Sequence, residues 1–186
     1  MGMESHDFEW AMRKCVSLGK DAAFSGNYGL GAMVIRNGEV IGASGSGLVE
    51  GTDPTAHPEV VAIRMAAKRA GSRYLSGAYL ITTLEPCPMC TAAAIWAKMA
   101  GVVYGAAQPD AVQWAAGHPD DTFTWRQIGM RARDVVRAGE PVIELHEGVC
   151  RDYCLELFPL TGTSSRGRGR RTEALQSTRT ATRTLP

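Results

Sequence analysis

Apolar residues recur along this chain at two different spacings, which separates predicted helices from predicted strands. Residues 5–18 carry them three or four positions apart, as in an amphipathic helix, and Cys15 falls on the apolar face, which predicts a core position. Short apolar runs bounded by glycine or proline predict strands at 31–36, 39–44, 79–84 and 101–106. Asn37-Gly38, between the first two runs, is a strong signal for a hairpin turn.

The remaining segments complete an alternating pattern of helices and strands. We predict helices over 56–70, 88–99, 124–138 and 149–157 and a short strand over 141–145, with irregular segments at 21–30, 45–55 and 107–121. A helix separates the runs 79–84 and 101–106, so a parallel crossover is expected there. The order of elements predicts an α/β fold, a three-layer α/β/α sandwich around a central mixed five-stranded sheet.

The composition fits one domain followed by a tail. A chain of 186 residues with 45% apolar residues is ordinary for one globular core, which we place at residues 1–160. Apolar residues nearly vanish over 161–186, which predicts a disordered, solvated tail. The tail contains six arginines, so contact with nucleic acid or a partner is the alternative: Arg166, Arg168, Arg170, Arg171, Arg179 and Arg183.

The charge balance changes once the tail is set aside. Without residues 163–186 the chain has 14 basic and 18 acidic residues, a net charge of about −4, although the whole chain carries +1. A domain that binds nucleic acid is expected to show a basic face on its folded part. The count does not indicate such a face, so a nucleic-acid partner is disfavoured.

Three sequence features bear on location. No run of 18 or more apolar residues is present, so no membrane-spanning helix is expected. The first residues lack a basic segment followed by an apolar one, so a secretory signal is not expected. The five cysteines are an odd number, which favours a reducing compartment over a disulfide framework. Together these features predict a cytoplasmic protein.

His57 and Glu59, together with Cys87 and Cys90, form the candidate chemical centre. One imidazole and two thiolates are good zinc ligands, and a site with three protein ligands keeps a fourth position for water, as catalytic zinc sites do. Zinc lowers the pKa of water from about 15.7 to roughly 7, and the carboxylate of Glu59 can transfer protons. Both pairs fall at the start of a predicted helix, where the helix dipole favours thiolates.

A Cys-x-x-Cys pair alone has two other interpretations. It could be a redox pair, which is typical of a thioredoxin-like setting, or half of a structural zinc site. A structural site would need a fourth ligand, and the spare candidates are His118, His146, Cys150 and Cys154. The combination of the two cysteines with His57, Glu59 and an intervening strand favours catalytic zinc.

Two stretches resemble the cytidine-deaminase-like superfamily: Asp53-Pro54-Thr55-Ala56-His57-Pro58-Glu59 and Glu85-Pro86-Cys87-Pro88-Met89-Cys90. They look most like the guanine deaminase and tRNA adenosine deaminase branch, and the resemblance runs from about Asp7 to about Ile128. It implies a zinc ion on His57, Cys87 and Cys90, with Glu59 as the catalytic proton carrier in a hydrolytic deamination. It also implies a homodimer in which residues 140–160 contribute to the pocket.

The resemblance also indicates residues that contact the substrate. The stretch from Asp120 to Ile128 is similar to a guanine deaminase segment whose second acid, here Asp121, recognises the guanine edge. Ser46 stands where the branch usually has a base-contacting asparagine, and Pro58 where it usually has alanine. Three other predicted substrate contacts lie within the two motifs and a fourth follows the strand predicted at 101–106: Ala56, Glu85, Pro86 and Trp114. Trp114 would form a base-stacking wall, with core packing as the alternative.

The expected function is therefore zinc-dependent hydrolytic deamination of a free nucleobase or nucleoside. Guanine, or a related aminopurine or triazine, is the favoured substrate, and guanine would give xanthine and ammonia. The alternatives are a tRNA adenosine-to-inosine deaminase, which the acidic body disfavours, and a cytosine or cytidine deaminase. A zinc-stabilised scaffold without enzymatic activity is the remaining interpretation, and the intact Glu59 disfavours it.

Overall fold

The computed structural model describes residues 5–48, 51–119, 125 and 128–161 of the chain. In chain order its elements are α1 (Ser5–Phe24), β1 (Gly31–Arg36), β2 (Glu39–Gly45), α2 (Pro58–Ala70), β3 (Ala78–Leu84), α3 (Pro88–Trp96), β4 (Gly101–Ala106), α4 (Gln108–Gly117), α5 (Ala132–Ala138), β5 (Glu144–Glu147), α6 (Arg151–Leu155) and α7 (Leu157–Leu160). Within these described ranges, no helix is both long enough and apolar enough to cross a membrane.

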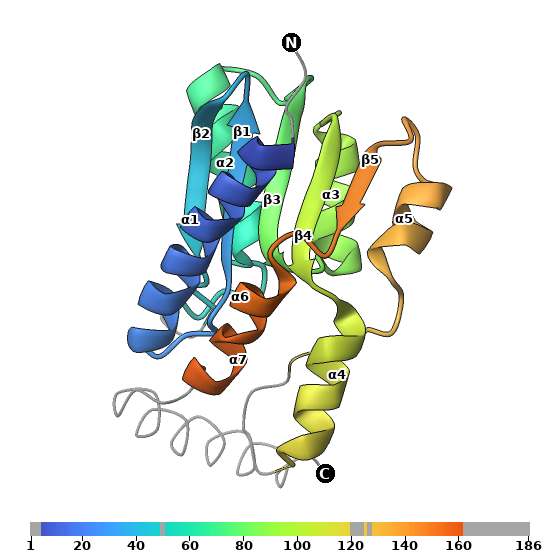
Figure 1. Ribbon diagram of the computed structural model, residues 1–186. Helices are drawn as coiled ribbons and strands as arrows, with labels where there is room; N and C mark the ends of the chain where they lie inside the picture. The colour runs from blue at the N-terminus through green and yellow to red at the C-terminus, as the bar shows by residue number, and fades with distance from the viewer. Residues whose placement is uncertain (1–4, 49–50, 120–124, 126–127, 162–186) are drawn as a thin grey trace, which may run out of the picture.

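The strands form one mixed sheet, which helices cover on both sides (Figure 1). In the described part of the chain the sheet has five strands in the order β2-β1-β3-β4-β5. β1 is antiparallel to β2 and β3, whereas β4 runs parallel to β3 and β5. α1, α6 and α7 pack on one face and α2, α3 and α5 on the other. The predicted three-layer α/β/α sandwich and the crossover through α3 are confirmed.

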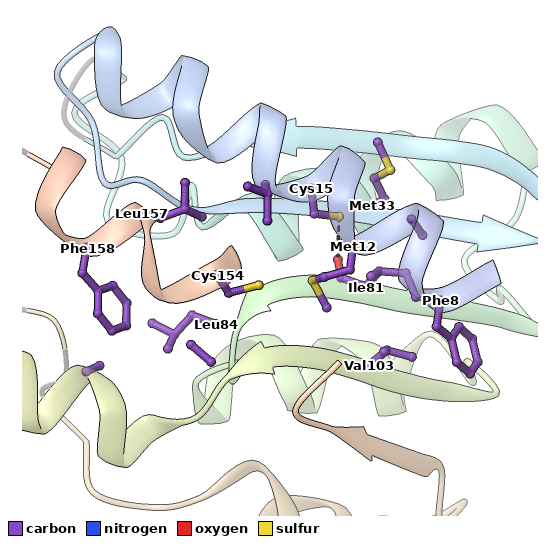
Figure 2. Close-up of a cluster of buried hydrophobic side chains, with 14 of the residues drawn as sticks. Phe8, Met12, Cys15, Met33, Ile81, Leu84, Val103, Cys154, Leu157 and Phe158 are labelled. Carbon is purple, nitrogen blue, oxygen red and sulfur yellow. Dashed lines mark hydrogen bonds between the residues drawn. The ribbon is translucent and has the colours of Figure 1, made fainter. Parts of the chain in front are cut away.

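Each face of the sheet has its own buried core. Figure 2 shows the core under α1, one cluster of buried side chains that includes Phe8 and Met12 of α1, Ile81 of β3, Val103 of β4, Cys154 of α6 and Leu157 of α7. Cys15, predicted as core, is fully buried, and its thiol donates a hydrogen bond to the carbonyl oxygen of Ile81 at 3.6 Å. The core on the opposite face joins α2, α3 and α5 to the sheet through Ala62, Ile63, Leu80, Ile95, Val102 and Val136.

Gly42 in β2 determines how closely α2 lies on the sheet. A side chain at this position would place its Cβ 2.2 Å from the carbonyl oxygen of Ala62, so only glycine fits. Gly31 in β1 is equally close to α1, because its Cβ would lie 2.1 Å from the carbonyl oxygen of Cys15. The backbones of α1 and α2 therefore rest directly on the strands, which limits sliding of either helix along the sheet.

Two segments predicted as irregular contain helix. α1 continues to Phe24, so the loop predicted at 21–30 begins later. The segment 107–121 was predicted as irregular and instead contains α4. Pro109 is compatible with the first helical turn, and the Asp110 carboxylate accepts a hydrogen bond from the backbone N–H of Ala107 at 2.8 Å. A proline and an aspartate that suggest a loop thus begin a helix here.

Four later predictions differ from the structure. The helix predicted over 124–138 is wrong in its first half, because α5 begins only at Ala132 and the described residues before it are not helical. The strand predicted at 141–145 lies at Glu144–Glu147, where it pairs with β4, and the helix predicted at 149–157 is divided into α6 and α7. Thr161, the first residue assigned to the tail, is buried and accepts a hydrogen bond from the backbone N–H of Gly29 at 2.9 Å.

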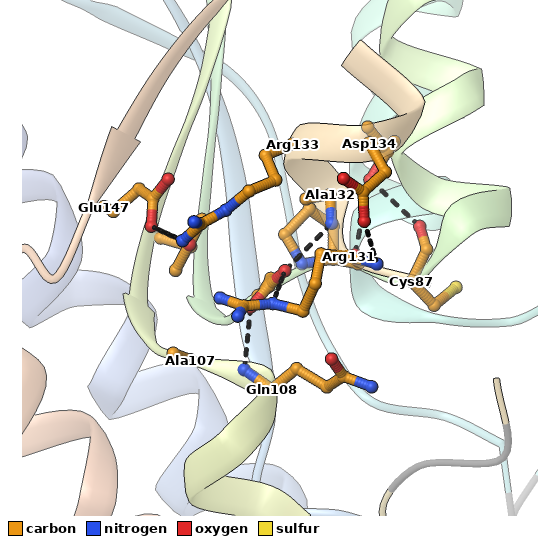
Figure 3. Close-up of polar contacts among 12 residues, drawn as sticks. Cys87, Ala107, Gln108, Arg131, Ala132, Arg133, Asp134 and Glu147 are labelled. Atoms are coloured by element: carbon orange, nitrogen blue, oxygen red, sulfur yellow. Dashed lines mark hydrogen bonds and ion pairs between the residues drawn. The ribbon is translucent and has the colours of Figure 1, made fainter. Parts of the chain in front are cut away.

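Glu85, which follows β3, holds α4 and α5 to the sheet. Its buried carboxylate accepts hydrogen bonds from the backbone N–H groups of Gln108 at 2.8 Å and Ala132 at 2.9 Å, and from Nε of Arg131 at 2.8 Å. Figure 3 shows the three donor residues, Gln108, Arg131 and Ala132, with dashed lines to their shared acceptor. Burial alone would raise the pKa of Glu85, but these hydrogen bonds outweigh it and lower the pKa below its ordinary value. The start of α5 is therefore fixed by a residue 47 positions earlier.

Replacing Glu85 with glutamine should lower the free energy of unfolding at pH 7 by about 2–4 kcal/mol, because the amide N–H group would face buried donors. A carboxylate with a lowered pKa in the folded state stabilises the fold above its unfolded pKa, and this contribution is lost as the pH falls through the folded pKa. The difference between wild type and Glu85→Gln should therefore shrink between pH 7 and about pH 3 in urea unfolding measurements.

Glu147→Gln is the matched control for this prediction. Glu147 pairs with Arg133 at 3.0 Å and accepts a hydrogen bond from the Tyr104 hydroxyl at 2.6 Å, but its side chain is partly exposed to solvent. Its replacement should cost less than about 1 kcal/mol, because the glutamine oxygen can still accept from Tyr104 and exposed ion pairs contribute little. Equal losses for the two variants, or a difference that does not change with pH for Glu85→Gln, would contradict the role given to Glu85.

Candidate active site

Two helix starts bring the predicted metal ligands together. His57 is the N-cap residue of α2 and Cys87 is the N-cap residue of α3, both with extended backbone. Proline follows each of them, because its fixed φ and missing N–H suit the first helical position. Cys90 lies in the first turn of α3, and β3 leads directly into this turn. The positive ends of two helix dipoles therefore point at the group, which favours ionised thiols.

The three ligand atoms form a compact triangle. Nδ1 of His57 lies 3.7 Å from Sγ of Cys87 and 3.5 Å from Sγ of Cys90, and the two sulfurs are 3.5 Å apart. Tetrahedral zinc with Zn–S bonds of about 2.3 Å and a Zn–N bond of about 2.0 Å separates its ligand atoms by about 3.5–3.8 Å. Zinc therefore fits these residues. Within 5–48, 51–119, 125 and 128–161, no other group of three histidine, cysteine or acidic side chains is arranged to hold a metal.

The two thiols are electrostatically coupled. The hydrogen bond between the two sulfurs lowers the pKa of Cys87 to about 4, with His57 contributing in the same direction. The same bond, together with burial, raises the pKa of Cys90. A divalent cation bound by both sulfurs would displace the thiol protons, because metal ligation requires thiolates.

Glu59 lies beside this triangle and is almost completely buried. Its Oε1 accepts a hydrogen bond from the Thr82 hydroxyl at 2.9 Å, and its Oε2 accepts one from the Cys90 thiol at 3.5 Å. Burial raises the pKa of Glu59 above its ordinary value, partly offset by the charge of His57. A buried carboxyl group with a raised pKa can accept and return a proton close to neutral pH.

The predicted substrate contacts differ in their surroundings. Ala56 and Pro86 directly precede the ligands His57 and Cys87, and the carbonyl oxygen of Pro86 accepts a hydrogen bond from Thr91 at 3.3 Å. Ser46 follows β2 and is buried, and its hydroxyl has no hydrogen-bond partner among the described residues. Glu85 is engaged by the backbone of α4 and α5, as described above.

The structure describes Trp114 but not Asp121. Trp114 was predicted to lie on a loop and instead belongs to α4, where its ring stacks on His118 with centroids 3.7 Å apart. Its indole N–H is buried and has no hydrogen-bond partner among the described residues. Asp121 lies outside the described residues. Its contact with the substrate stays a prediction.

Sequence reasoning missed Thr82 as a member of the site. Two consecutive threonines, Thr82 and Thr83, interrupt the apolar run of β3. Successive residues of a strand point to opposite faces, so one of any two neighbours must face the helix layer that contains α2. That alternation was the available signal, but it could not tell which threonine faces Glu59 before the orientation of the sheet was known.

Comparison with known proteins agrees with this geometry. A sequence model of the cytidine and deoxycytidylate deaminase zinc-binding region matches residues 5–106. Guanine deaminase from Bacillus subtilis is 36% identical over 127 residues, which cover 68% of this chain and 80% of the relative. A solved structure from work on tRNA:A34 deaminases has a TM-score of 0.63 and 28% identity, and the match covers 80% of this chain and 98% of that one.

Another relative is much longer than this chain. The tRNA(Ile)-lysidine synthase of Deinococcus radiodurans is 37% identical over 145 residues, and the match covers 74% of this chain but only 25% of that protein. The chain thus spans about a quarter of the length of this relative. Because the family match covers more than half of the chain and contains all three ligands and Glu59, the chain belongs to the cytidine and deoxycytidylate deaminase family, in its zinc-binding region.

Proposed function

We propose that the protein catalyses the hydrolytic deamination of a free nucleobase or nucleoside, with guanine, or a related aminopurine or triazine, as the favoured substrate. The observation that carries this proposal is the buried Glu59 carboxyl group directly beside the triangle of His57, Cys87 and Cys90. A structural zinc site has no need for an unligated acid at this position. A hydrolytic site needs one to move protons.

The chain supplies the proton transfers of this reaction. Bound zinc would provide the activation of water at neutral pH. Glu59 accepts a proton from water and delivers it to a ring nitrogen, and it then accepts the remaining proton of the added hydroxyl group and delivers that proton to the departing amine. A C–O bond forms at the carbon that carried the exocyclic amine, the C–N bond breaks, and ammonia leaves with no change in oxidation state. The raised pKa of Glu59, caused by its burial, favours the return of the proton.

Ser46 and Asp121 are the proposed contacts to the base. The Ser46 hydroxyl is buried without a hydrogen-bond partner among the described residues, so a polar substrate group would offset its desolvation. Asp121 is the proposed partner of the guanine edge, where a carboxylate can accept from adjacent ring and amino N–H groups. The B. subtilis relative, which is named guanine deaminase, supports this choice of base. By the same family resemblance we expect a homodimer.

Deamination of adenosine in tRNA is the second candidate. A tRNA-specific adenosine deaminase from Agrobacterium fabrum is 45% identical to this chain, but over only 80 residues, or 43% of it. The body of the chain without residues 163–186 has more acidic than basic residues. Binding of tRNA depends mainly on contacts between basic groups and phosphates, so an acidic body disfavours this candidate.

Replacing Glu59 with glutamine should reduce ammonia release by about 10²–10⁴-fold, because the amide cannot carry the proton. Zinc content should stay near that of the wild type, since Glu59 is not among the three ligands. Steady-state ammonia assays together with metal analysis of the same preparations check both expectations. A rate of ammonia release by Glu59→Gln close to that of the wild type would exclude the proposed proton transfer.

A panel of substrates separates the candidate functions. The zinc-loaded protein is incubated with guanine, guanosine, adenine, cytosine, cytidine and a tRNA anticodon stem-loop, and ammonia is measured for each. We expect the highest kcat/KM for guanine and no activity on the stem-loop, because the body lacks an excess of basic residues. Activity on the stem-loop alone would establish the second candidate instead.

Asp121→Asn should lower kcat/KM for guanine by about 10–100-fold, because it removes charge-assisted hydrogen bonds to the base edge. Asp120→Asn is the matched control, since it removes the same charge one residue away. We expect its kcat/KM to stay within about threefold of the wild type. Equal losses for both variants would indicate a general electrostatic effect and contradict the specific contact of Asp121.

A further inference from the structure

Thr82 contacts the side chain that the proposed function makes the proton carrier. We propose that Thr82 is a positioning residue for Glu59: its hydroxyl holds Oε1 in place so that Oε2 stays directed toward the metal ligands. This inference rests on the proposed function. The Thr82 hydroxyl donates to Oε1 of Glu59 at 2.9 Å, while Oε2 lies 3.5 Å from Sγ of Cys90. The two oxygens of one carboxyl group are thus directed to two different partners.

The position of the Thr82 hydroxyl is set by the sheet. Thr82 lies in β3 and is paired with Ala32 of β1 on one side and with Tyr104 of β4 on the other. Its side chain is fully buried, and a β-branched side chain has few rotamers available. The hydroxyl is therefore a fixed point that does not depend on α2, the helix that carries Glu59.

Glu59 needs such a fixed point. Its side chain has three rotatable bonds, and α2 fixes only the first atoms of that chain. A proton carrier must stay within hydrogen-bond reach of the reacting atoms, so rotation of the carboxyl group away from the ligands would interrupt the reaction. The bond from β3 restricts this rotation, because it connects the far end of the side chain to a second element.

Thr83 provides a matched comparison within the same strand. It is the same residue type and almost fully buried, but it faces the opposite side of the sheet. Its hydroxyl accepts a hydrogen bond from the backbone N–H of Gly31 at 3.2 Å and does not contact Glu59. Removing the Thr83 hydroxyl therefore measures the general effect of losing a buried threonine hydroxyl from β3. It leaves the hydrogen bond between Thr82 and Glu59 in place.

The test compares Thr82→Val, Thr82→Ser and Thr83→Val in the full-length, zinc-loaded protein with guanine as substrate. Valine matches threonine in shape, so Thr82→Val removes the hydroxyl without leaving a cavity. We expect kcat to fall by about 10-fold or more in Thr82→Val while KM changes by less than about threefold. Thr82→Ser should recover kcat to within about threefold of the wild type, and Thr83→Val should leave kcat unchanged.

Two measurements that do not depend on activity accompany the kinetics. Zinc content and the visible absorption of the cobalt-substituted protein should be the same in all variants, because the three ligands are unchanged. Unaltered kcat in Thr82→Val, an equal loss in Thr82→Ser, or loss of metal from Thr82→Val would each overturn the proposal. If Thr82→Val does not fold, Thr82→Ala replaces it in the comparison with Thr82→Ser.

The outcomes also separate this inference from the proposed function. A wild type that releases no ammonia from any base in the panel would contradict the proposed function and remove the basis for a positioning role. An active wild type together with an equally active Thr82→Val would contradict only the role of Thr82.

Discussion

The convergence of two helix starts on three ligand atoms is the constraint on which the rest of the site depends. His57 and Cys87 are 30 positions apart in the chain, yet each is the residue before a helix that begins with proline. The helix ends favour negative charge, and the ligand set supplies it as thiolates. A metal ion can then balance these thiolates and the buried carboxyl group beside them, which would otherwise be costly to bury.

The sheet maintains this convergence by close contact on both of its faces. Gly42 lets the backbone of α2 lie directly on β2. This close packing limits movement of α2, and so of His57 and Glu59, away from the start of α3. On the other side of the centre, Glu85 connects the end of β3 to α4 and α5. Glu85, which positions the surrounding helices, is therefore only two positions from the ligand Cys87, in the turn after β3.

The parts of the molecule that sequence could predict are those with local causes. The ligands and Glu59 follow from their chemistry and spacing, and the hairpin at Asn37-Gly38 follows from its turn residues. The start of α5 could not be predicted, because it depends on a hydrogen bond from Ala132 to a distant carboxylate. The contact between Thr82 and Glu59 was equally hidden, since it requires the packing of α2 on β3 to be known.

The surroundings of the Thr82 hydroxyl have a consequence for the two protonation states of Glu59. Two acceptors lie within reach of its single hydrogen: Oε1 of Glu59 at 2.9 Å and the carbonyl oxygen of Leu84 at 3.2 Å. When Glu59 is ionised, Oε1 accepts this hydrogen; when Oε2 carries a proton, Oε1 is the carbonyl oxygen of the acid and can still accept it. The hydrogen bond from Thr82 can therefore persist in both forms of Glu59, and no heavy atom has to move between them.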